Sequence, residues 1–186
     1  IQFKEFSSCL GEDIEGMMWR FTPIGESDVD YWISRDADSR SSYREKKMID
    51  EWIKSNKTLH TILDHPCHGS LMGGLFGVNN KLLRKNYPDK IIDMNKFIPE
   101  LAKKQNIRRG YDQQWINKHL LNIAKKDKDV LVHLNNSAQC LKRCHIGNVK
   151  PITENFETIL LEPTSNFSGK QINYFPSKLK RPLIEI

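Results

Sequence analysis

Residues 28–40 read Asp-Val-Asp-Tyr-Trp-Ile-Ser-Arg-Asp-Ala-Asp-Ser-Arg, and this stretch decides the fold class. Apolar residues recur at every second position from 29 to 33, which is the period of a β-strand. Asp36 and Asp38 stand where that strand should end and a loop begin. Carboxylates at such a position can hold Mg²⁺ or Mn²⁺, which completes its shell with phosphate oxygens. The other interpretation is a solvated turn that caps the next helix.

The segments that follow predict an alternation of helix and strand. Ser42 and Glu45 form a capping-box pattern ahead of apolar residues at helical spacing, which predicts a helix over 42–54. Residues 58–63 are typical of a second strand. Further along, the sequence predicts a helix and two more strands, over 112–124, 130–134 and 157–162. Strand, helix and strand in this order indicate an α/β sandwich whose function lies at the strand ends.

The segment between 69 and 77 is rich in glycine and apolar residues. It suits a close approach of backbone to a ligand better than an ordinary helix. It is not a phosphate-cradling loop of the nucleotide-triphosphatase type, because no Gly-Lys-Ser/Thr follows it. The basic stretch 80–110 is predicted to be partly helical, with a break or a new turn at Pro99.

Composition excludes some classes of protein and favours others. The 186 residues are enough for one well-buried core, and no run of apolar residues is long enough for a membrane segment. A formal net charge of +6 favours anionic partners. Four cysteines without a dense framework favour a reducing compartment, the cytoplasm of the organism or of a host cell, over secretion. Targeting cannot be read from the chain, which shows neither an initiator Met nor a signal-peptide pattern.

Four elements occur in an order that resembles a known family. They are Asp36-Ala-Asp38, the Gly-rich run Gly73–Gly77, Asp112-Gln-Gln-Trp-Ile-Asn117, and His145-Ile-Gly-Asn-Val-Lys-Pro151. This order is similar to that of glycosyltransferases of the GT-A fold, in particular the retaining group that includes glycogenin and the bacterial lipooligosaccharide galactosyltransferases. The segment from Arg35 to Pro66 also resembles a domain of uncharacterised bacterial and viral glycosyltransferases. The resemblance covers about residues 17–151 of a single domain, 1–186, with 152–186 as a C-terminal extension.

The resemblance implies a GT-A-like, Rossmann-type mixed sheet flanked by helices, and a role for each matching residue. A Mn²⁺ or Mg²⁺ ion would neutralise the leaving diphosphate of a nucleotide-sugar donor, while a glycan or another hydroxyl compound accepts the sugar. No nucleic acid is expected as a partner. The metal ligands would be Asp36, Asp38 and one of His133 and His145. The donor-binding residues would be Arg20, Arg35, Gly73, Gly74 and Lys150. The catalytic residues would be Asp112 and Gln113, with Asp64 as general base for the acceptor hydroxyl in an inverting variant.

Each role has a simpler structural alternative. Asp112 can serve as a helix cap, Asp64 can shape a turn before His65 and Pro66, and Lys150 can be an exposed lysine. Only 35 residues precede Asp36, fewer than the family places there, so the base-binding half of the fold is expected to be incomplete. Two other functions remain open: a non-catalytic module that binds anionic or sugar ligands, and a metal-dependent phosphodiester hydrolase that uses Asp36, Asp38 and Asp64.

Overall fold

The computed structural model describes residues 14–36, 39, 41–65, 68, 71–103, 110–121, 128–136 and 157–162. Its helices are α1 (Ile14–Trp19), α2 (Tyr43–Ser55), α3 (Asn80–Asn86), α4 (Met94–Ala102) and α5 (Tyr111–Ile116). Its strands are β1 (Tyr31–Arg35), β2 (Leu59–Leu63), β3 (Leu75–Asn79), β4 (Val130–Asn135) and β5 (Glu157–Leu161). Short helical turns lie at η1 (Thr22–Gly25), η2 (Pro88–Lys90) and η3 (Asn117–Leu121), the last with π geometry.

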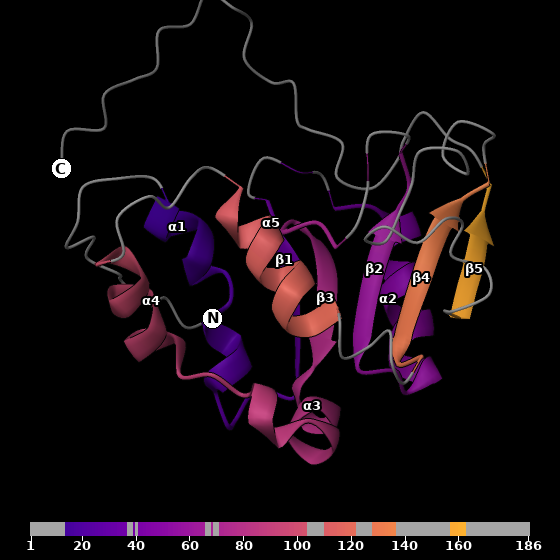
Figure 1. Ribbon diagram of the computed structural model, residues 1–186. Coiled ribbons are helices and arrows are strands. Elements are labelled where there is room, and N and C mark those ends of the chain that lie inside the picture. The colour runs from indigo at the N-terminus through magenta and orange to yellow at the C-terminus, as the bar shows by residue number, and fades with distance from the viewer. Residues whose placement is uncertain are drawn as a thin grey trace, which may run out of the picture.

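The strands form one mixed sheet in the order β1-β3-β2-β4-β5 (Figure 1). The β2–β4 and β4–β5 pairs are parallel. Strand β3 runs antiparallel to both of its neighbours, β1 and β2. Strands β1 and β2 therefore point the same way, although β3 separates them. The predicted α/β class is confirmed as a five-stranded mixed sheet flanked by helices.

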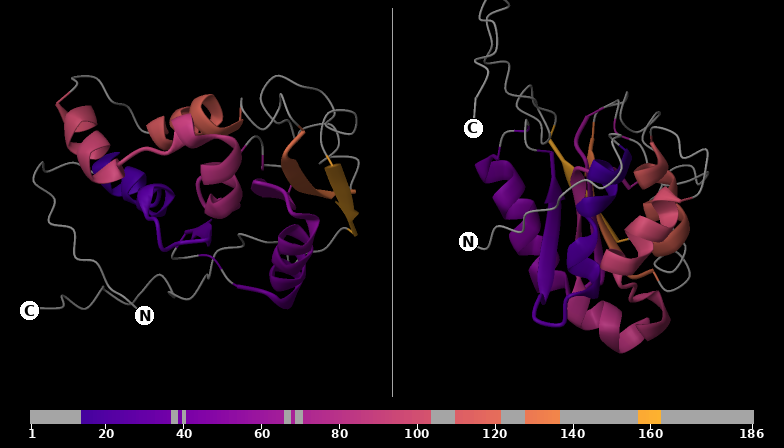
Figure 2. Two further views of the ribbon diagram at one scale, coloured as in Figure 1. Left: turned by 90° about the horizontal axis from the view of Figure 1, so that it is seen from below. Right: turned by 90° about the vertical axis from the view of Figure 1, so that its left-hand side faces the viewer.

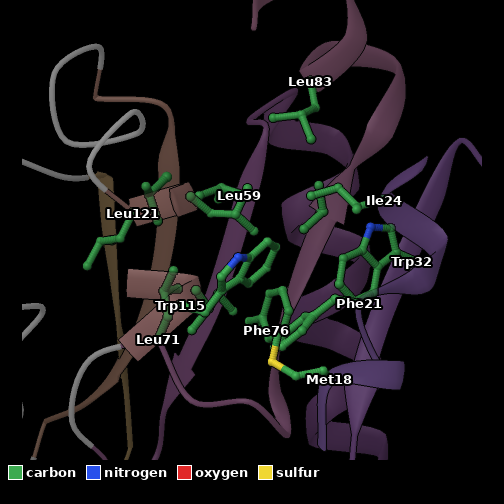
Figure 3. Packing of buried hydrophobic residues seen from close by; sticks show 14 of the residues in the cluster. Met18, Phe21, Ile24, Trp32, Leu59, Leu71, Phe76, Leu83, Trp115 and Leu121 are labelled. Atoms are coloured by element: carbon green, nitrogen blue, oxygen red, sulfur yellow. The ribbon is translucent and has the colours of Figure 1, made fainter. Parts of the chain in front are cut away.

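Helices cover both faces of this sheet. Helix α2 lies on one face, and α5 lies on the other with α1, α3 and α4 on the same side (Figure 2). The larger core cluster fills the second side, where Phe21 packs on Trp115 with ring centroids 4.8 Å apart (Figure 3). A smaller cluster of Met48, Ile62 and Leu75 lies under α2. The sheet is thus the middle layer of three, as both-face burial of β2, β3 and β4 requires.

Helix α2 begins and ends where its sequence predicts. The Ser42 hydroxyl accepts a hydrogen bond from Glu45 N over 3.1 Å, which satisfies one of the free N–H groups of the first turn. At the other end Asn56 adopts a left-handed conformation with φ of 56°, which stops the helix. The inward side of α2 carries Met48 and Trp52, both fully buried. The capping pattern and the apolar spacing together account for this helix.

One strand was not predicted, and one sequence-based expectation is wrong. Residues 71–74 form a turn that leads into the buried strand β3, which the Gly-rich composition does not suggest. Pro99 neither breaks nor begins a helix, because it lies inside α4 on its exposed side. On that exposed side, water can bind the Asn95 carbonyl, which would otherwise lack the hydrogen bond that a proline cannot donate. Among the described helices, none combines the length and the apolar character that a membrane crossing requires.

Candidate functional site

The candidate site lies where β1 ends and β3 begins. The antiparallel register pairs Arg35 with Leu75, so the next residue after β1, Asp36, lies opposite Gly74, the residue before β3. Glycine is required there, because a Cβ at Gly74 would lie 2.7 Å from Asp36 Oδ1 and closer still to Oδ2. The Asp36 carboxylate therefore rests directly on the Gly74 backbone. The Gly-rich segment thus allows a close approach, and the approaching group is a carboxylate of the chain itself.

Gly73 is crowded in the same way by groups from two other segments. A Cβ at Gly73 would lie 2.8 Å from Arg20 Nη1, 2.8 Å from the end of the Gln113 amide group and 2.9 Å from Asp112 Oδ2. These three polar atoms converge on one point, although they come from the end of α1 and from the first turn of α5. We call this set of residues the glycine cradle: Arg20, Asp36, Gly73, Gly74, Asp112 and Gln113.

Arg20 and Asp36 form the ion pair of the cradle. Arg20 Nη1 donates to Asp36 Oδ1 over 3.0 Å, and the two side chains are 26% and 49% exposed. The Asp36 carboxylate is therefore open to solvent on one side. Its second oxygen makes no hydrogen bond or ion pair with the residues that the structure describes. A half-exposed carboxylate with a free oxygen is a suitable ligand for a divalent cation.

Helix α5 contributes Asp112 and Gln113. With its amide nitrogen turned toward Leu71, Gln113 donates to Leu71 O over 2.9 Å and accepts from Gly73 N over 2.6 Å. Asn117 Nδ2 donates to Gln113 O over 2.6 Å and so ties the same turn of helix. Gln113 thus holds the cradle backbone in place. Asp112 differs, because it makes no hydrogen bond or ion pair with the described residues although the residue is only 4% exposed, and its carboxylate oxygens keep contact with solvent. A carboxylate that opens toward solvent beside Gly73 is available to a ligand.

The expected metal site is only partly within the described residues. Asp38, His145 and Lys150 lie outside them. Within the described ranges, no cluster of three or more His, Cys, Asp or Glu side chains is arranged to hold a metal ion. Asp36 alone of the expected carboxylate pair can be placed, and its solvent-facing oxygen fits the role.

Asp64 follows the last residue of β2, and its hydrogen-bond partners come from α2 and β4 rather than from the cradle. Arg44 donates to it twice, from Nε to Oδ2 over 2.9 Å and from Nη2 to Oδ1 over 2.8 Å. Asn135 Nδ2 adds a hydrogen bond to Oδ1 over 3.2 Å. The Asp64 side chain is fully buried in these contacts. Both of its oxygens thus have partners from α2 and β4, and the arrangement fastens the ends of β2 and β4 to the helix.

His133 lies in the middle of β4, with two strands between it and β1. Its Nε2 is 2.8 Å from Glu51 Oε2, and its Nδ1 is 2.8 Å from His60 Nε2. Since a carboxylate only accepts, His133 donates from Nε2 and accepts from His60 at Nδ1. His60 in turn stacks on Trp52, with ring centroids 5.3 Å apart. Both nitrogens of His133 are thus occupied on the α2 face of the sheet. We call Glu51, His133 and His60 the histidine network.

Burial controls the protonation of these histidines. It lowers the pKa of His133 below the usual 6.5, and the Glu51 carboxylate opposes that effect only in part. The pKa of His60 falls well below 6.5, first through burial and then through the proximity of His133. His68, buried beside the end of β2, has its pKa lowered to about 4, chiefly by burial. At neutral pH these side chains are uncharged.

Sequence reasoning missed Ser34, Glu45 and Glu51 as partners of the site and of the network. Ser34 donates through its hydroxyl to Gly73 O, and Glu45 pairs with Arg35. The one signal for Glu45 was its place in the capping-box pattern, which suggests a local role rather than a contact with β1. Comparison with known proteins adds no identification: no family model matches the chain, and no match is found among curated proteins or solved structures.

Proposed function

We propose that the chain is a metal-dependent glycosyltransferase with a GT-A-like fold. It moves a sugar, with retention of configuration, from a nucleoside-diphosphate donor to a hydroxyl acceptor such as a glycan. The observation that carries the proposal is the glycine cradle. It brings residues from the end of β1, the Gly-rich turn and the start of α5 into one place. These are three of the four elements on which the family resemblance rests.

Each cradle residue has a task in this proposal. Asp36 binds a Mn²⁺ or Mg²⁺ ion through the oxygen that Arg20 leaves free. When bound, that ion neutralises charge on the leaving diphosphate. Arg20 supplies a positive charge beside the same phosphates, and this contact becomes stronger as charge develops. Asp112, buried and without a partner among the described residues, faces the sugar and stabilises positive charge at its anomeric carbon. Gln113 holds the Gly73 backbone that separates these groups.

The two other functions differ in what they require. A phosphodiester hydrolase would need Asp64 as a third carboxylate beside Asp36 and Asp38. Both oxygens of Asp64 are engaged by Arg44 and Asn135, which weighs against that use. A non-catalytic binding module would keep the cradle and bind the donor without turnover. Binding and turnover must therefore be measured separately.

The test is a panel of nucleotide sugars with and without Mn²⁺, read by thermal stability and by slow release of free sugar. Binding to the folded protein raises its apparent stability. We expect one donor to raise the melting temperature only with Mn²⁺, and Asp36→Asn and Asp112→Asn each to lower sugar release at least about a hundredfold. Asp30→Asn is the matched control, because Asp30 is an exposed carboxylate that pairs with Arg84 outside the cradle. No stabilisation and no release with any donor would overturn the proposal, and stabilisation without release would establish the binding module.

A further inference from the structure

Arg35 contacts two groups that lie far apart in the sequence. Its Nη1 donates to Gly74 O over 2.7 Å, and its Nε and Nη2 face Glu45 Oε1 on α2. The Arg35 side chain is 21% exposed and that of Glu45 is 6% exposed. The guanidinium is therefore mostly enclosed between a carbonyl of the cradle and a carboxylate of the helix. Its Nη2 makes no hydrogen bond but is itself buried, so burial rather than a full set of hydrogen bonds keeps this nitrogen from a ligand.

The contact with Gly74 O acts on the residue that supports Asp36. Asp36 rests on the Gly74 backbone, so a shift of that peptide moves the carboxylate with it. On the other side of β1, the Ser34 hydroxyl donates to Gly73 O. Successive residues of a strand face opposite sides, so Ser34 and Arg35 hold consecutive carbonyls of the turn from both faces of the sheet. The turn is held by side chains as well as by the β1–β3 ladder.

Glu45 connects Arg35 to the capped first turn of α2. Its backbone N–H is bound by the Ser42 cap, which fixes the first turn of α2. In a complete capping box the Glu side chain would return to the backbone N–H of the cap, whereas Glu45 extends to Arg35 instead. The helix therefore transmits its position to the cradle through one ion pair.

From these contacts we infer that Arg35 is a positioning residue rather than a donor-binding residue. It fixes the Gly74 peptide between β1 and α2, and thereby holds Asp36 in the geometry that the metal and diphosphate require. The inference rests on the proposed function and corrects one role that the family resemblance implies. Only arginine suits the task, because its planar fork can serve a carboxylate and a carbonyl together, whereas lysine offers a single ammonium group.

The two roles of Arg35 predict opposite effects of Glu45. If Arg35 binds donor phosphate, Glu45→Gln removes a competing anion and tightens donor binding. If Arg35 is a positioning residue, Glu45→Gln loosens it and mimics Arg35→Lys. Because the two residues then act as one unit, the double variant should be no worse than Arg35→Lys alone.

The experiment compares Arg35→Lys, Glu45→Gln and the double variant by hydrogen exchange and by kinetics. Arg84→Lys is the matched control, since Arg84 also joins backbone carbonyls, Glu26 O and Val29 O, to a carboxylate, Asp30, outside the cradle. We expect about fivefold faster exchange in peptides that cover 71–79 for Arg35→Lys and Glu45→Gln but not for Arg84→Lys. We also expect kcat to fall about tenfold while the KM for the donor changes less than about twofold.

The readouts separate the two proposals. Exchange needs no substrate, so faster exchange without turnover by any donor would overturn the proposed function and support the positioning role. Unchanged exchange in both single variants would overturn the positioning role. So would a raised KM in Arg35→Lys together with a lowered KM in Glu45→Gln, which would show that Arg35 binds the donor. Glu45→Gln is nearly isosteric, and so it provides a folded variant even if Arg35→Lys is unstable.

Discussion

The polar residues on the two sides of the sheet differ in how many of their polar atoms have hydrogen-bond partners. Where β2, β4 and α2 meet, the carboxylate of Asp64 and the ring nitrogens of His133 are matched by partners inside the fold. At the cradle, where β1, β3 and α5 meet, Asp36 keeps one oxygen free and Asp112 has no partner among the described residues. Burial alone does not distinguish these residues, because Asp64 and Asp112 are both almost fully buried. The two carboxylates differ in the number of hydrogen bonds that each makes with the described residues.

This difference separates structural from functional carboxylates. A buried carboxylate with all its hydrogen bonds made stabilises the fold, and removing it leaves its partners unsatisfied. A carboxylate that keeps an oxygen in contact with solvent adds little to the stability of the fold, and that oxygen is available to a ligand. By this criterion Asp36 and Asp112 are the better site residues, and Asp64 and His133 the better structural ones. Substitutions on both sides of the sheet test that division.

The largest effect is expected from Asp64→Asn. It removes the charge that holds Arg44, and we expect the free energy of unfolding to fall by about 3 kcal/mol. The loss is no larger because Arg44 keeps some contact with solvent. Chemical denaturation measures the loss. Sugar release per folded molecule should change far less than in Asp112→Asn. A variant of full stability without turnover would instead make Asp64 catalytic.

Gly74→Ala should have the next largest effect and lower the free energy of unfolding by about 2 kcal/mol, because the new Cβ overlaps the Asp36 carboxylate. Turnover per folded molecule should fall as well, since Asp36 must move. Gly25→Ala is the matched control, because its Cβ would lie 2.7 Å from Ile92 O, outside the cradle. If both variants lose stability but neither loses turnover, the placement of Asp36 does not matter for the reaction.

His133→Leu is expected to cost about 1–2 kcal/mol at pH 7.5, because it leaves the donor of His60 without its acceptor. It should also reduce the pH dependence of stability. Burial lowers the pKa of His60 and His133 in the folded protein, so below about pH 6.5 the unfolded chain binds more protons than the folded one. The free energy of unfolding therefore decreases as the pH is lowered. Denaturation curves from pH 7.5 to 5 measure both effects. An equal slope in wild type and variant would show that the network does not titrate in this way.

Ser42→Ala should have the smallest effect, about 1 kcal/mol, from the loss of the α2 cap. Asp93→Ala is its control, because Asp93 caps α4 through a 3.1 Å hydrogen bond from Asn95 N. Thermal denaturation should show similar losses for the two variants. Only Ser42→Ala should speed hydrogen exchange in 71–79, since α2 supports Glu45. Equal exchange in both would break the proposed link from helix to cradle.

Local pattern was enough to predict many of the elements. The two-residue period before Asp36, the Ser42 cap and the apolar run ahead of Asp64 correctly predicted β1, α2 and β2. Strand β3 was missed because it is buried on both faces and follows two glycines, so it shows no alternation. Within it, Gly77 leaves room for the ring of Trp52, since a Cβ there would lie 2.8 Å from Trp52 Cζ3. No neighbouring residue in the sequence signals such a contact.

The sequence by itself determined the periodicity of the strands, the helix cap and the presence of Asp36, glycines and Asp112 in order. These depend on residues a few positions apart, whose conformations are limited by local sterics and hydrogen bonding. Only the tertiary structure decided which polar groups face one another. The antiparallel insertion of β3 places Gly74 beside Asp36, and the packing of α2 places Glu51 beside His133. Partners so distant in the chain are selected by packing and burial, which no local pattern records.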